Sequence, residues 1–325
     1  MVKISNIAFI FLLLQTSLLL GQRDIQFTQF AHNNYIHNPS LAGLNESLTI
    51  NALARFQWVG LKGAPFSQAL SADIPVPKLK SGWGVLITND IIGAATISTL
   101  QFTYAYHLKL SKKSRLSFGL SLGANSQFLN NSKLITPTGN YVDAEIAHND
   151  NLLGVENRNA IGLSSSLGVN FEISDLIIGL AFNELSNSLN NIEKNTLSGI
   201  NGQNLTLNSK YKLYLGRQWE FAPSVLVKTN IKYHQVDIQA NFEFNSFILF
   251  GIGYRGYNNS TSDALIGLFG LNLAEKLRLV YSYDFSLSPL RQTSIGSHEV
   301  GMQYAINGKW NKSKNVKKIY NPRNL

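Results

Sequence analysis

The sequence predicts an all-β protein, a transmembrane antiparallel β-barrel of about 14 strands that follows a cleaved signal peptide. Three observations predict this fold class: an N-terminal export signal, alternation of apolar and polar residues with period two, and alternating segments about 9 to 11 residues long. The 325-residue chain is 44% hydrophobic and only 14% charged. We expect a single barrel domain, because no linker or change of composition divides the chain.

The export signal occupies residues 1–21. Lys3 precedes an apolar stretch that ends at Leu20, and the small residue Gly21 comes before polar Gln22. This order is typical of a secretory signal peptide, so we expect cleavage near Gly21 or Gln22. After it, no apolar run approaches the roughly 18 residues that a transmembrane helix needs. The chain has no cysteine, which excludes disulfides, thiolate metal sites and lipid attachment at a cysteine.

Alternation with period two is the main evidence for strands, because strand side chains point to opposite faces in turn. The alternation is nearly uninterrupted in residues 100–110, 235–244 and 277–285. The less apolar face is rich in small polar residues, as in residues 117–125. Such a face suits a wet barrel lumen and makes a poor core for a soluble β-sandwich, which is the alternative that alternation alone leaves open.

The predicted barrel spans residues 47–307. An even number of strands returns both ends of the barrel to one side of the membrane, which in outer-membrane barrels is the periplasm. Joins after odd-numbered strands are mostly longer than joins after even-numbered ones, as expected for outer loops and periplasmic turns. We therefore predict an outer-membrane location with both termini periplasmic. The strands are expected to begin near Ser47, Phe66, Gly82, Ile97, Ser114, Arg158, Ser174, Leu205, Phe221, Gln235, Ser246, Asp263, Lys276 and His298.

Two segments flank the predicted barrel. Residues 22–46 alternate little and are rich in Asn and aromatic residues, so we expect a segment that either plugs the barrel or lies beneath it in the periplasm. Residues 308–325 form a basic periplasmic tail, which either is solvated or docks onto an acidic periplasmic partner. The candidate contacts with this partner are Lys309, Lys312, Lys314, Lys317, Lys318 and Arg323.

No pattern in the chain points to an enzyme, so we expect no catalytic residue, cofactor or metal site. Gly251, Gly253 and Gly256 match G-x-G-x-x-G, but a strand rather than a helix is expected after them. The six histidines do not have metal-ligand spacing. The net charge of +9 comes without a nucleic-acid recognition motif, so we expect membrane lipid and no nucleic acid as a partner. Inward-facing charges are expected to balance one another: Arg55, Lys109, Lys210, Lys212, Asp237, Glu243, Arg278 and Asp284.

Seven blocks of the chain occur in a characteristic order. They are QFTQFAHNNYIHNPSLAG (26–43), RFQWVGLKGAPFSQALSADIP (55–75), GWGVLITNDIIGAAT (82–96), YAYHLKLSKKSRLSFGLSLGAN (104–125), PSVLVKT (223–229), YSYDFSLSPL (281–290) and GSHEVGMQY (296–304). Together these blocks resemble the PorP/SprF family of the type IX secretion and gliding-motility apparatus.

The resemblance implies a non-catalytic outer-membrane barrel that acts in secretion or cell-surface anchoring of a cargo protein with a C-terminal sorting domain. It also implies association with the periplasmic ring components of the secretion machine. The residues themselves leave open a second function, a passive outer-membrane diffusion channel or nutrient pore. A pore requires an open lumen, so occlusion of the lumen distinguishes the two functions.

Overall fold

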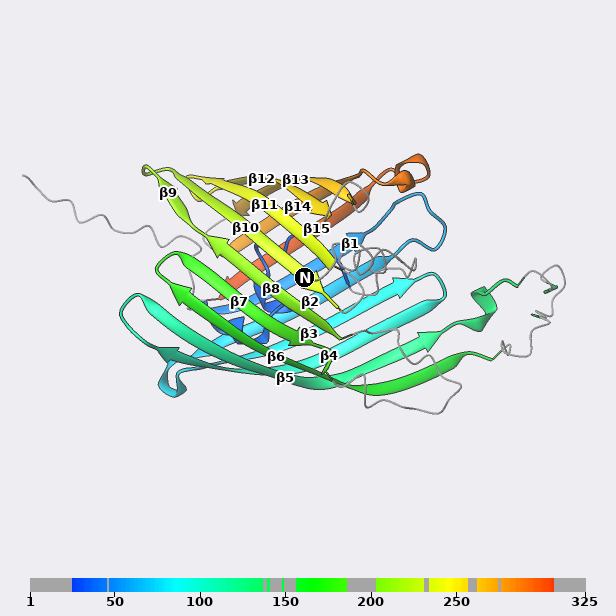
Figure 1. Cartoon of the computed structure of the whole chain (residues 1–325), viewed down its shortest axis with the longest axis horizontal. Helices are drawn as coiled ribbons and strands as arrows, with labels where there is room; N and C mark the ends of the chain where they lie inside the picture. Colours follow the sequence, from blue (N-terminus) through cyan, green and yellow to red (C-terminus); the bar gives the residue numbers. More distant parts are fainter. Residues whose placement is uncertain are drawn as a thin grey trace, which may run out of the picture.

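The computed structural model describes residues 25–45, 47–136, 139–140, 148, 156–185, 203–230, 234–256, 262–273 and 276–306. The predicted signal peptide and basic tail lie outside the described residues. All strands belong to one antiparallel sheet (Figure 1). The sheet closes into a barrel, because β10 pairs with β8 on one side and with β11 on the other.

The barrel has fourteen strands, as the sequence predicts. The assigned segments are β1 (Leu48–Phe56), β2 (Phe66–Val76), β3 (Ser81–Ile92), β4 (Ala95–Lys109), β5 (Ser114–Leu129), β6 (Arg158–Ile173), β7 (Leu176–Asn183), β8 (Asn204–Tyr211), β9 (Leu213–Leu215), β10 (Trp219–Thr229), β11 (His234–Phe244), β12 (Ile248–Gly256), β13 (Ala264–Leu273), β14 (Leu277–Ser286) and β15 (Ser297–Ile306). Only Lys212 separates β8 from β9, and both pair with β10, so they form one barrel strand. Each barrel strand begins within two residues of its predicted start.

The helical segments among the described residues are short 3-10 turns. They are η1 (Asn34–Ile36), η2 (Pro39–Leu41), η3 (Pro77–Leu79), η4 (Asn131–Lys133) and η6 (Pro289–Gln292). Within the described ranges, no helix is long and apolar enough to cross a membrane.

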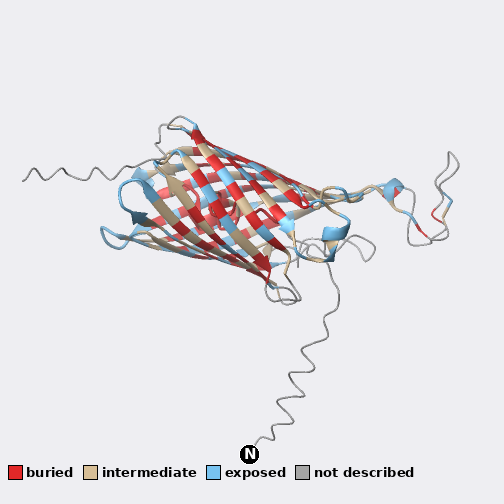
Figure 2. Cartoon of the chain, turned by 90° about the horizontal axis from the view of Figure 1, so that it is seen from above, coloured by how far each residue is buried: buried red, intermediate tan, exposed pale blue. Residues whose placement is uncertain are grey.

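The two faces of the wall differ in chemistry, as the alternation predicts. Along β4, Phe102 and Tyr104 point outward and are exposed, whereas Gln101 and Thr103 point inward and are buried. Figure 2 shows the same alternation of buried and exposed residues around the wall. An exposed apolar outer face suits lipid, and closure leaves no unpaired strand edge in the hydrocarbon region.

The two ends of the barrel differ in the length of their joins. At one end, here called the short-turn end, the joins include residues 77–80, 110–113 and 174–175. At the other, here called the long-loop end, they include residues 130–157 and 184–203, with the short joins between β3 and β4 and between β10 and β11 as exceptions. β1 begins and β15 ends at the short-turn end. The periplasmic location of both termini stays a prediction.

Candidate functional site: a plugged lumen

Residues 25–45, here called the plug, lie inside the barrel. Ile25 is at the long-loop end, where Lys228 donates a hydrogen bond to its carbonyl at 2.7 Å. Gly43 is at the short-turn end, where its N–H donates to Asp73 at 2.9 Å. Between them, the Tyr35 hydroxyl lies 2.7 Å from Thr103 Oγ1. The sequence left open whether this segment plugs the barrel or lies beneath it, and the structure places it in the lumen.

Local sequence shapes the middle of the plug. Asn38 precedes η2 and its side-chain oxygen accepts a hydrogen bond from the Ser40 N–H at 3.0 Å. Pro39 occupies the first helical position, where a missing N–H costs little. The Asn38 amide nitrogen also donates to Asn208 Oδ1 at 3.2 Å. One asparagine therefore both caps the turn and ties the plug to the barrel wall.

Glycines of the wall, which have no side chain, lie where the plug backbone comes closest to it. A Cβ atom on Gly119 would lie 2.2 Å from Ser40 N, and one on Gly82 would lie 2.0 Å from the Ala42 carbonyl oxygen. Neither backbone can shift easily, so only glycine fits at these inward-facing positions. The small residues that the sequence assigned to a wet lumen therefore make room for the plug.

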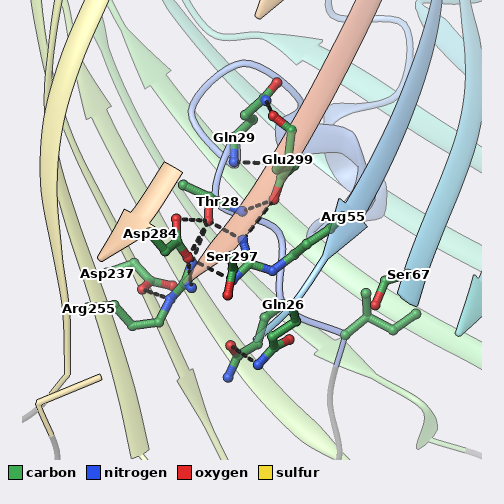
Figure 3. A network of polar contacts seen from close by, with 12 residues as sticks. Gln26, Thr28, Gln29, Arg55, Ser67, Asp237, Arg255, Asp284, Ser297 and Glu299 are labelled. Atoms are coloured by element: carbon green, nitrogen blue, oxygen red, sulfur yellow. Dashed lines mark hydrogen bonds and ion pairs between the residues drawn. The ribbon is translucent and has the colours of Figure 1, made fainter. Parts of the chain in front are cut away.

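A buried network of ions lies between the plug and the wall near the long-loop end (Figure 3). Arg55 contacts Asp284 at 2.6 Å and Glu299 at 3.3 Å. Arg255 contacts Asp237 and Asp284, each at 2.7 Å. All five side chains are at most 2% exposed. Buried charges are costly unless each is paired, and here each arginine contacts two carboxylates.

The network binds the backbone of the plug. The Thr28 N–H donates to Glu299 Oε2 at 2.7 Å and the Gln29 N–H donates to Glu299 Oε1 at 2.9 Å. The Thr28 hydroxyl accepts from Arg55 at 2.7 Å, and the Thr28 carbonyl accepts from Gln239 at 2.6 Å. Figure 3 shows Thr28 between the two groups of charges. The network therefore acts as a clamp on this turn of the plug.

A second set of contacts ties the plug nearer the short-turn end. Lys210 donates to the Ala31 carbonyl at 2.8 Å, and Arg278 pairs with Glu243 at 2.9 Å. The Arg278 Nη1 atom lies 3.4 Å from Nδ1 of His32. Burial, followed by the nearby lysines and Arg278, lowers the pKa of the plug residue His32 well below its ordinary value. The neutral ring can therefore accept this contact.

Most of the predicted lumen charges do balance one another, but two members of the network were missed. Lys109 is exposed at the end of β4, and Lys212 pairs with the partly exposed Glu220 at 3.3 Å. Arg255 and Glu299 were not among the predicted lumen charges. Their inward position in the period-two pattern of β12 and β15 was the available signal.

A cavity of about 110 Å³ lies beside the plug at the long-loop end. Its lining includes Phe27 and Ile36 of the plug and Leu86 and Ile97 of the wall. His37 also lines it and is 5% exposed. Burial, with a smaller contribution from the Lys228 ammonium, lowers the pKa of His37 well below its ordinary value. The imidazole is therefore neutral.

The described residues contain no arrangement that would hold a metal ion: no group of three His, Asp or Glu among them has the necessary geometry. The glycines at 251, 253 and 256 belong to β12, and strand β13 follows. The G-x-G-x-x-G match is therefore part of a barrel strand. The candidate partner contacts Lys309, Lys312, Lys314, Lys317, Lys318 and Arg323 lie outside the described residues.

A known protein family matches most of the chain. The family described as "Type IX secretion system membrane protein PorP/SprF" matches residues 19–304. The chain belongs to the PorP/SprF family. The PorP/SprF match covers the plug and the barrel wall as far as Tyr304 of β15. Family and fold together make the chain an outer-membrane component of type IX secretion.

Solved structures similar to this PorP/SprF chain are outer-membrane barrels. The CymD monoaromatic hydrocarbon channel superposes with a TM-score of 0.52 at 14% identity, over 86% of this chain and 93% of that one. The Pseudomonas putida toluene transporter TodX gives 0.48 at 10% identity, over 83% and 92%. Omp33 of Acinetobacter baumannii gives 0.46 at 7% identity, over 81% and 100%. At these identities the likeness concerns the fold alone. A search of curated protein sequences gives no match.

Proposed function

We propose that this chain is a non-catalytic component of the type IX secretion system that acts in secretion or cell-surface anchoring of a cargo protein with a C-terminal sorting domain. The family membership supports a place in the type IX secretion system. The plugged lumen supports a role in holding a protein partner. A component that holds or passes on a protein partner needs a stable barrel and exposed loops, whereas it needs no conducting lumen.

The plug is the observation that carries the proposal. Its residues bond to inward faces far apart around the wall, from Asn208 of β8 to Glu299 of β15. The buried ion network holds it in place, so it is a built part of the barrel. A passive diffusion channel or nutrient pore needs a continuous aqueous path with an arranged constriction. The hydrocarbon channel CymD shares the fold, which supports no more than a common architecture.

Conductance in planar bilayers tests the role of the lumen. We expect the full chain to show no steady open state, and a variant that lacks residues 25–45 to show large conductance steps. A steady large open state of the unaltered chain would favour the diffusion channel and contradict the anchor. In cells, loss of the chain is expected to remove a sorting-domain cargo from the cell surface, while outer-membrane permeability to small solutes stays unchanged.

We also propose that the basic tail, residues 308–325, docks onto acidic periplasmic ring components of the machine. The tail carries six basic residues and no acidic ones. The short-turn end, where β15 ends, adds exposed Lys78, Lys80, Lys112 and Lys113. An acidic surface would be attracted over about 8 to 10 Å at physiological salt. On this proposal, the short-turn end faces the periplasm and the long loops face outward.

A further inference from the structure

The cavity at the long-loop end is a space in the lumen that the plug leaves unfilled. It lies toward β3, β4 and β6–β8, away from the clamp formed by β1, β14 and β15. On its plug side are Phe27, Ile36 and His37. The cavity is therefore formed jointly by plug and wall, and a ligand within it would touch both.

The lining has an apolar part and a polar part. Phe27, Ile36, Leu86 and Ile97 supply the apolar surface. Around them are amides and hydroxyls that both donate and accept hydrogen bonds, among them Gln101, Ser166 and Thr206. A ligand that matches this lining has an apolar group next to a group that donates and accepts at once. A peptide amide beside an apolar side chain has this composition.

Charge at the cavity disfavours an anionic ligand. Two carboxylates, Asp90 and Glu184, and one ammonium, Lys228, line it. The ammonium already donates to the Ile25 carbonyl at 2.7 Å. A bound carboxylate or phosphate would meet two negative charges, whereas a neutral amide meets no such repulsion. A neutral polar group beside an apolar one is therefore a better match to this lining than a carboxylate.

His37 also lines this space. Its Nε2 atom is buried and has no hydrogen-bond partner among the described residues. A buried polar atom without a partner destabilises the protein by about 1–3 kcal/mol, so a ligand that bonds to it would gain affinity. The neutral ring can present Nε2 as a donor or as an acceptor, depending on the tautomer.

The volume limits the ligand to one side chain. About 110 Å³ is somewhat less than the roughly 150 Å³ of an engineered protein cavity that holds benzene. A four-carbon aliphatic side chain therefore fits, and a larger compact molecule does not.

We propose that this cavity binds one apolar side chain of a polypeptide segment presented at the long-loop end, with His37 and the neighbouring amides and hydroxyls binding the adjacent backbone amide. The inference deepens the proposed function, because it rests on a polypeptide being the partner. On this inference, a short segment of that partner is held at the cavity beside His37.

The test uses the absence of native cysteine. The full chain carrying Thr99→Cys, a cavity-lining position, is purified in detergent and alkylated by a small water-soluble reagent. N-acetyl-leucinamide is expected to slow alkylation in a saturable manner, while N-acetyl-glycinamide and N-acetyl-leucine with its free carboxylate slow it much less. Ser111→Cys, on an exposed turn at the short-turn end, is the control reporter and should react equally with every probe.

Two further variants locate the effect in the Thr99→Cys background. Thr88→Leu places a larger side chain in the cavity and is expected to abolish protection. Thr96→Leu, on the outward face of β4, is expected to leave protection unchanged. His37→Phe is expected to raise the leucinamide concentration that gives half-maximal protection by about fivefold, which corresponds to the loss of one hydrogen bond. His37→Gln is expected to restore part of the lost affinity.

Three results would overturn the inference. They are equal protection by the glycine and leucine amides, protection that survives Thr88→Leu, and no protection at all. The readout is alkylation in detergent with blocked amino acids, so it is independent of secretion and conductance. A negative result in the alkylation assay leaves the proposed function standing. Failure of the secretion assay does not change the result of the alkylation assay.

Discussion

Replacing Glu299 by alanine should loosen the plug without disrupting the barrel. Glu299 accepts hydrogen bonds from the backbone N–H groups of Thr28 and Gln29, at 2.7 and 2.9 Å, and is fully buried. It also contacts Arg55 at 3.3 Å, but Arg55 keeps its 2.6 Å ion pair with Asp284. The variant therefore removes two anchors of the plug and leaves no cation without a partner.

The size of the effect follows from the two lost anchors. A hydrogen bond to a charged group contributes about 1.5–3 kcal/mol, so the two anchors stabilise the seated plug by about 3–6 kcal/mol. Water can enter the space left by the side chain and satisfy the two N–H groups, so we take the lower end. About 3 kcal/mol corresponds to roughly a hundredfold larger population of the unseated plug.

Alkylation of a cysteine placed in the plug measures that population. Ala31 is 2% exposed, so a cysteine at this position reacts only when the plug leaves its seat. In the Ala31→Cys background, Glu299→Ala should speed alkylation by about a hundredfold and produce transient conductance steps in bilayers. Glu172→Ala is the matched control, because Glu172 and its partner Arg115 are both partly exposed. Exposed ion pairs contribute only about 0–1 kcal/mol.

Equal alkylation rates for Glu299→Ala and Glu172→Ala would refute the reasoning. That result would mean that the plug is held by shape alone, through its fit to the glycine-lined wall, and that the ion network is incidental.

Further predictions concern the seat of the plug, the barrel, its orientation and the tail. Gly119→Val should also speed alkylation of the plug cysteine, because its Cβ would meet Ser40 at 2.2 Å, whereas Gly267→Val, with nothing within 4 Å of its Cβ, should not. The unheated protein should run faster than the boiled protein on a detergent gel, and identical mobility would contradict a closed barrel. Protease added to intact cells should cut within residues 130–157 and spare residues 308–325, and cleavage of the tail would reverse the topology. Truncation after Asn307 should leave the barrel assembled and weaken co-purification of periplasmic components, most clearly at low salt. Equal recovery with and without the tail would make it a solvated extension.

The wall of the barrel could be predicted from the sequence because its signal is local. Alternation along a strand repeats every two residues, so Phe102 and Gln101 reveal opposite faces without reference to any other part of the chain. Turn positions mark where one strand ends and the next begins, and these two signals together predict fourteen starts to within two residues. The break at Lys212 has no such local signal, and it does not change the strand count.

The clamp and the cavity could not be predicted in the same way. Arg55 and Asp284 are 229 residues apart in the chain. They meet only because closure of the barrel places β1 beside β15, whose other neighbour is β14. Charge type and inward parity identified both residues as lumen charges, but neither property says which opposite charge lies nearby. Glu299 has the same inward parity in β15, so its place among the lumen charges could have been predicted, but its contacts with the plug could not.

The sequence by itself therefore determined the strand positions, the lipid-facing and inward-facing sides, and the resemblance to PorP/SprF. The export signal at the N-terminus stays a prediction. Only the tertiary structure decided that residues 25–45 fill the lumen, that Thr28 is held between two arginines and Glu299, and that a cavity remains beside His37. The physical reason is the range of the interactions. Strand periodicity depends on neighbours one and two residues away, whereas the path of the plug depends on the shape and charge of a lumen that exists only after all fourteen strands have paired.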